Sequence, residues 1–185
     1  MPREVSAYQV FIASPGGLDE ERKRFREIVN EHNENHALEN GVLFIPVGYE
    51  QTPRGMGRPQ QLINDDLKRS DYCIFLLHDR WGSPTSKPAL YSSGTEEEFS
   101  LAMELFRAGT MLDLLVFFKA VDPSRLSDPG PQLQKVLDFR RELEDGKELF
   151  PYPYSGLELF EKAVRKHLST WMYAHLKRQV SGRLK

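Results

Sequence analysis

The stretch "DYCIFLLH", residues 71–78, decides the fold class. Between its polar ends every residue is apolar, which is typical of a strand covered on both faces. A Gly/Pro/Ser-rich loop at 79–94 follows, and a helical pattern begins after it. A doubly covered strand followed by a helix indicates a parallel sheet with helices packed on both sides.

Strand and helix patterns alternate five times along the chain. Strands are predicted at 8–13, 42–49, 71–78, 111–119 and, with prolines that suit an edge position, 148–154. Helices are predicted at 18–36, 59–69, 95–107, 132–146 and 156–178. This alternation predicts an α/β, flavodoxin-like three-layer fold, in which a five-stranded parallel sheet of order 2-1-3-4-5 carries helices on both faces.

Size and composition fit a single soluble domain. The chain has 185 residues and 39% hydrophobic residues, so we expect one domain over 1–178 and a basic tail or linker stub at 179–185. A net charge of −2 gives no reason to expect nucleic acid or a membrane as a partner. Cys73 is the only cysteine, and the N-terminus lacks a signal-peptide pattern. We expect a cytoplasmic setting.

The predicted order of the strands indicates where the binding crevice lies. Ligands of such sheets bind beyond the carboxyl ends of the strands, at the switch between strands 1 and 3. The loops 14–18 and 78–95 meet there, and the helix of "GTEEEFSLA" begins inside the crevice. Four residues at helical spacing form the buried stripe of this helix: Phe99, Ala102, Met103 and Phe106.

The stripe separates three consecutive glutamates. Glu97 lies opposite the stripe and is predicted to face water, whereas Glu96 and Glu98 flank it and can reach the crevice. Thr95 and Glu98 also fit a capping box, in which the glutamate folds back to the start of its own helix. Capping of the helix by Glu98 is compatible with a role for Glu98 in the crevice. A carboxylate near a helix N-terminus stays ionised, and an ionised carboxylate suits both roles.

Three stretches carry a resemblance to a known family: "FIASPGGLDEERKRFREIV" (11–29), "SDYCIFLLHDRWGSP" (70–84) and "SSGTEEEFSLA" (92–102). Together they resemble the domain of unknown function found at the N-terminus of many STAND-type NTPases. That domain is related to TIR domains and to nucleoside deoxyribosyltransferases. Ala13-Ser14-Pro15 and Gly94-Thr95-x-x-Glu98-x-x-x-Ala102 are similar to the transferase motifs, in which the glutamate is the nucleophile. The resemblance therefore implies Glu98 as the catalytic residue.

The resemblance also implies an activity. TIR-like relatives with a glutamate in this region break the nicotinamide–ribose bond of NAD, so this chain is expected to be an NAD glycohydrolase with NAD as substrate and no bound cofactor. An effector role in bacterial antiviral defence is implied, with self-association or fusion to a larger regulatory protein. Two alternatives stay open: a non-catalytic nucleotide-binding or protein-interaction module of the same fold, and a nucleoside deoxyribosyltransferase.

Residues around the crevice are the candidate contacts. The backbone of the turn after strand 1 suits a phosphate or ribose at a helix N-terminus, although a plain turn is an equal interpretation. The candidate substrate-binding residues are Ser14, Pro15, Gly16, Gly17, Asp79, Arg80, Trp81, Ser93 and Thr95.

Arg22 lies on an apolar stripe and needs a carboxylate partner, such as Asp19, for a structural ion pair or phosphate contact. His32 and His36 have metal-compatible spacing without a third ligand, so no metal site is expected. The Gly-x-Gly of "RGMGRP" (54–59) is interpreted as a loop.

Overall fold

The computed structural model describes residues 4–48, 59–84 and 90–183. The five strands are β1 (Ser6–Ala13), β2 (Val42–Gly48), β3 (Tyr72–Leu77), β4 (Asp113–Lys119) and β5 (Pro151–Tyr154). The helices are α1 (Asp19–Asn40), α2 (Pro59–Lys68), α3 (Gly94–Arg107), α4 (Gly130–Gly146) and α5 (Leu157–Arg183), with a 3-10 turn, η2, at Pro123–Arg125.

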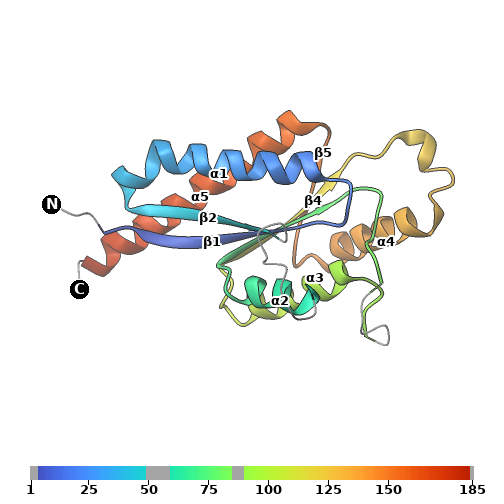
Figure 1. The fold of residues 1–185 in the computed structure, drawn as a ribbon, viewed down its shortest axis with the longest axis horizontal. Coiled ribbons are helices and arrows are strands. Elements are labelled where there is room, and N and C mark those ends of the chain that lie inside the picture. The colour runs from blue at the N-terminus through green and yellow to red at the C-terminus, as the bar shows by residue number, and fades with distance from the viewer. Residues whose placement is uncertain (1–3, 49–58, 85–89, 184–185) are drawn as a thin grey trace.

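The strands form one parallel sheet of order β2-β1-β3-β4-β5. The predicted fold class and strand order are therefore confirmed. Helices α1 and α5 cover one face of the sheet, and α2, α3 and α4 cover the other (Figure 1). The order reverses between β1 and β3, so the loops after these two strands diverge to opposite faces and leave a crevice at the sheet edge.

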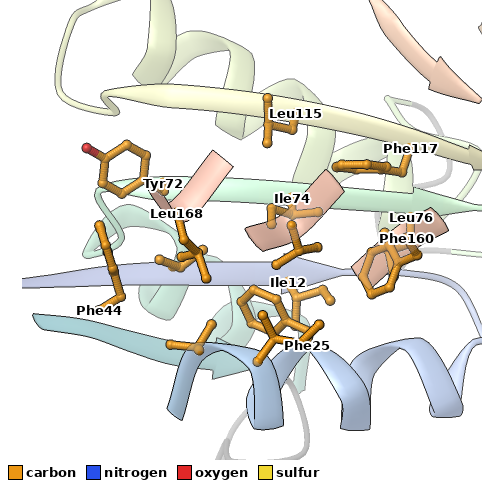
Figure 2. Close-up of a cluster of buried hydrophobic side chains, with 14 of the residues drawn as sticks. Ile12, Phe25, Phe44, Tyr72, Ile74, Leu76, Leu115, Phe117, Phe160 and Leu168 are labelled. Carbon is orange, nitrogen blue, oxygen red and sulfur yellow. The ribbon is translucent and has the colours of Figure 1, made fainter. Parts of the chain in front are cut away.

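Two hydrophobic clusters, one on each face of the sheet, hold the layers together. Alternate residues of each strand enter opposite clusters because strand side chains alternate between faces. Figure 2 shows the cluster under α1 and α5, where Ile12 and Ile74 of the sheet lie with Phe25 of α1 and Phe160 of α5. Cys73, on the other face of β3, is fully buried in the second cluster.

The element boundaries lie within a few residues of those predicted, with one larger difference. Helix α5 continues to Arg183, so it runs into the segment that the sequence analysis assigned to a tail. The Gly-x-Gly of 54–59 lies outside the described residues. Among the described helices, none has the length and apolar character required to cross a membrane.

The outer edge of β2 is covered by a side chain from α1. The amide of Asn33 donates to the carbonyl of Phe44 at 2.6 Å and accepts from the Phe44 N–H at 2.9 Å. Both backbone groups of Phe44 therefore point away from β1. Pro46, two residues on, points to the same outer side and has no N–H to offer.

The opposite edge, β5, is short and contains two prolines. The carbonyl of Tyr154 accepts from Ala120 N at 2.8 Å, so Tyr154 and, by alternation, Tyr152 direct their backbone groups toward β4. Pro151 and Pro153 consequently lie on the outer side, where a missing N–H breaks no bond of the sheet.

Candidate functional site

A cleft of about 740 Å³ lies at the carboxyl ends of β1 and β3. Its walls come from the loops after these strands and from the first turns of α2 and α3, with η2 and α4 closing one side. The lining residues are Pro15, Gly16, Gln60, Asp79, Arg80, Gly82, Ser83, Pro84, Gly94, Thr95, Glu98, Arg125 and Gln132. The cleft thus lies at the switch point that the sheet order predicts.

The start of α3 determines which glutamate is available to the cleft. Ser93 is the N-cap residue, with extended backbone, and its hydroxyl accepts from Glu96 N at 3.1 Å. The carboxylate of Glu96 folds back and accepts from Ser92 N at 2.6 Å and Ser92 Oγ at 2.7 Å. The capping pair is therefore Ser93 with Glu96, and the predicted Thr95–Glu98 box is wrong. Because both Ser93 and Thr95 are capping residue types, the sequence allowed two registers.

Glu98 lies in the cleft wall without a capping role. Its Oε1 accepts a hydrogen bond from Gln60 Nε2 at 2.9 Å. The residue keeps some surface toward the cleft, but its carboxyl group is enclosed. Burial, with a smaller contribution from the nearby charge of Glu97, raises the pKa of Glu98 to about 7, while the Gln60 hydrogen bond lowers it. The carboxyl group consequently changes charge near neutral pH.

The prediction that Glu97 faces water is wrong. Glu97 is only 5% exposed, and its Oε1 accepts from Asn64 Nδ2 of α2 at 3.0 Å. The helical spacing of apolar residues correctly identified the side of α3 that faces the sheet. It did not reveal that α2 packs against a second side and buries a polar residue there.

The turn after β1 divides into lining and supporting residues. Pro15 and Gly16 line the cleft, whereas Ser14 accepts a hydrogen bond from Arg22 Nη1 at 2.5 Å. Gly17, with φ +95°, makes the turn into α1, and it is not among the lining residues. The fully buried Arg22 also forms an ion pair with Asp19. Arg22 therefore contacts both Ser14 in the turn and Asp19 at the start of α1, and it holds the turn against this helix.

Two arginines and an aspartate form the polar side of the cleft. Asp79 accepts from Arg125 Nη1 at 2.5 Å, and hydrogen bonding to Arg125 together with nearby positive charge keeps the pKa of Asp79 below its usual value, against the opposing effect of burial. Arg80 is exposed and lines the cleft, its Nη1 close to Gly16. No carboxylate among the described residues pairs with Arg80.

Two further candidates, Trp81 and Ser93, lie next to the cleft without lining it. Trp81 is 6% exposed; its Nε1 donates to Ser92 Oγ at 2.8 Å, and its ring packs 5.1 Å from that of Phe139. Ser93 is fully buried at the helix cap. Neither side chain is among those that line the cleft, in contrast to Thr95.

Sequence reasoning missed several residues of the site: Gln60, Arg125 and Gln132 line the cleft, and Asn64 accepts a hydrogen bond from Gln60. Gln60 and Asn64 lie one helical turn apart on α2, and Gln132 of α4 accepts from the N–H groups of Trp81 and Gly82 at 2.8 and 3.2 Å. The four-residue spacing of two amides after a cleft loop was a usable signal for the first pair. Nothing in the sequence marked Gln132 or Arg125, whose positions depend on how α4 and η2 fold back.

Glycines at two points let the backbone approach other walls of the cleft. A Cβ at Gly94 would lie 2.6 Å from Gln60 Oε1, and one at Gly82, which has φ +112°, would lie 2.9 Å from Thr95 Oγ1. The positive φ of Gly82 requires glycine, whereas a side chain at residue 94 would displace the Gln60 amide. Within the described ranges, no three histidine, cysteine or acidic residues are grouped so that they could hold a metal ion.

Comparison with known proteins identifies one family and two solved structures of low sequence identity. Residues 9–169 match the family described as "Domain of unknown function (DUF4062)". The TIR domains of the activated Roq1 resistosome, which directly recognizes the pathogen effector XopQ, are 15% identical with a TM-score of 0.41, over 86% of this chain and 82% of that one. The general stress protein 14 of Treponema denticola, solved with FMN, is 13% identical with a TM-score of 0.36, over 92% and 98%. No curated protein matches the sequence significantly.

Proposed function

The chain belongs to the family described as Domain of unknown function (DUF4062), and for this member we propose NAD glycohydrolase activity, with Glu98 as the catalytic residue. The reaction takes NAD and water to nicotinamide, ADP-ribose and one proton. The observation that carries the proposal is the position of Glu98, which lines the cleft while Glu96 performs the capping role. The sequence motif around Glu98 supports the same residue.

The chemistry of this bond suits a single carboxylate. As the bond between C1′ of the ribose and the nicotinamide nitrogen breaks, positive charge develops on the ribose. Ionised Glu98 would stabilise that charge, or attack C1′ and be displaced by water. The ring nitrogen of nicotinamide is positively charged in NAD and takes the electron pair of the broken bond. Nicotinamide therefore leaves as a neutral molecule, and no acid is needed to protonate it. The rate should therefore rise with pH as Glu98 ionises, near pH 7.

Arg80 favours a dinucleotide over a neutral nucleoside. The Arg80 guanidinium, which pairs with no carboxylate of the described residues, suits the diphosphate of NAD, because arginine binds phosphate through two parallel hydrogen bonds. A deoxynucleoside carries no charge for Arg80 to meet. The cleft volume of about 740 Å³ lies within the usual range for small-molecule sites, roughly 300–1,000 Å³.

The test compares wild type with Glu98→Gln by chromatography of NAD and its products, at low and high protein concentration. We expect nicotinamide release by the wild type and a loss of about a hundredfold or more in the variant. Glu104→Gln, an exposed residue of the same helix, serves as the matched control and should keep the wild-type rate. Equal nicotinamide release by wild type and Glu98→Gln would refute the assignment, and a rate that rises steeply with protein concentration would reveal a dependence on self-association.

A nucleotide-binding module without catalysis is the second candidate. The pKa of Glu98, about 7, leaves about half of the molecules with a neutral carboxyl at pH 7, and a neutral carboxyl can donate a hydrogen bond to a ligand. Calorimetry at pH 6 and pH 8 would distinguish the two. Saturable nucleotide binding with no nicotinamide release at either pH would favour the binding module.

A further inference from the structure

Two amide side chains of α2 connect Glu97 and Glu98 of α3. Gln60 Nε2 donates to Glu98 Oε1 at 2.9 Å and to Asn64 Oδ1 at 3.2 Å. Asn64 Nδ2 in turn donates to Glu97 Oε1 at 3.0 Å. We call these four residues the amide relay.

The direction of each bond in the relay follows from what the groups can do. An ionised carboxylate only accepts hydrogen bonds, so the NH₂ groups of Gln60 and Asn64 must face Glu98 and Glu97. The carbonyl of Asn64 is then left to accept the second hydrogen of Gln60. Both hydrogens of Gln60 Nε2 are thereby used, and one reaches the group proposed to act on substrate.

The position of Gln60 is enforced by the backbone of α3. A Cβ at residue 94 would lie only 2.6 Å from Gln60 Oε1, so the amide occupies its place because residue 94 is glycine. This close approach is independent of the hydrogen bonds in the relay. Gly94 therefore leaves room for the amide that reaches Glu98.

We propose that Gln60 is a positioning residue for Glu98, holding its carboxylate in the cleft wall and stabilising its charged form, with Asn64 and Glu97 fixing the orientation of the Gln60 amide. The catalytic consequence rests on the proposed function; the effect on Glu98 itself does not. The hydrogen bond from Gln60 lowers the pKa of Glu98, against the burial and the Glu97 charge that raise it.

Among the described residues, other ionisable groups lie on β3 and along the cleft wall. On β3, the Cys73 thiol has its pKa raised first by burial and then by Glu98, so it stays neutral. Asp79, Arg80 and Arg125 line the same cleft. They are left unchanged in the variants below, so a difference between variants reports on the relay.

The test measures the pKa of Glu98 directly, by carbon NMR of protein labelled at the glutamate side-chain carboxyl. Glu98→Gln identifies the resonance. Gln60→Met keeps the length of the side chain and removes its hydrogen bonds, and we expect the pKa to rise by about one pH unit or more. Gln60→Glu adds a like charge and should raise it further. Gln61→Met, at the next and exposed position of α2, is the matched control and should leave it unchanged.

The outcomes are separable from those of the proposed function. If Gln60→Met and Gln60→Glu titrate at the wild-type pH, or Gln61→Met moves the titration as much, the inference is overturned. If the wild type releases no nicotinamide, the NAD proposal fails, yet the NMR titration still decides whether Gln60 controls Glu98. If NAD is cleaved, the acid limb of the kcat profile should move with the NMR value. A limb that stays in place would refute the positioning role in the reaction.

Discussion

Replacing Glu98 by glutamine should make the protein more stable at alkaline pH, whatever its substrate. The pKa of Glu98 is about 7 in the folded protein, against an ordinary value of 4.5. Below pH 4.5 the carboxyl is neutral in both states. As pH rises toward 7, the unfolded chain loses this proton before the folded protein does, so the folded state loses stability relative to the unfolded state.

The size of the effect follows from the two pKa values. At about 1.4 kcal/mol for each pH unit between them, an ionised Glu98 destabilises the fold by about 3 kcal/mol above pH 7. Most of this change falls between pH 5 and pH 8. In Glu98→Gln it is absent, so the unfolding free energy of the variant should gain about 2–3 kcal/mol on the wild type over that interval. For a domain of this size, the gain corresponds to a melting temperature higher by about 5–10 °C.

The assay is urea unfolding of wild type and variant at pH 5, 6, 7 and 8, with the difference between the two proteins taken at each pH. The pH dependence from other groups cancels in the difference; these include His32 and His175, whose pKa values are lowered in the folded protein, chiefly by burial. Glu104→Gln on the exposed side of α3 should show a flat difference. A flat difference for Glu98→Gln would refute the claim that Glu98 is enclosed in the cleft wall.

Three further substitutions test other parts of the structure. Arg80→Gln should raise the KM for NAD about tenfold with little change in kcat, and a KM equal to that of the wild type would remove Arg80 from the binding site. Gly94→Ala places a Cβ 2.6 Å from Gln60 Oε1, so NAD hydrolysis should fall about tenfold in initial-rate assays; an unimpaired rate would mean that this contact is not needed. Lys119→Met leaves Glu21, which is 2% exposed and 2.6 Å from Lys119 Nζ, without its cation. Urea unfolding should show a loss of about 3–5 kcal/mol, and a loss below about 1 kcal/mol would contradict this account.

The sheet could be predicted from the sequence because its signals are local. The run around Cys73 is apolar on both faces, and helical spacing identified the stripe with Ala102 and Met103. The location of the cleft could be predicted from the strand order alone. The register of the α3 cap could not be decided, because Ser93 and Thr95 are both capping residues.

The environment of Glu98 required tertiary contacts that no local pattern records. Burial of Glu97 depends on the packing of α2 against α3, and so does the hydrogen bond from Gln60 to Glu98. Trp81 is one of the candidate substrate-binding residues, but its indole donates to Ser92 and does not line the cleft. For Glu97 and Glu98 the residue type was informative about chemistry, and the direction of the side chain depended on contacts with α2, which is distant in sequence.

The two outer strands have a consequence for how copies of this chain could meet. A visiting strand needs a row of free N–H and C=O groups to pair with, and such rows are where proteins polymerise or aggregate. On β5, the two successive residues that point outward are both prolines. On β2, the outward N–H and C=O of Phe44 are already hydrogen-bonded to Asn33, and the next outward residue is Pro46. We therefore expect any homotypic assembly to be built from helix and loop surfaces, with each five-stranded sheet remaining a closed unit.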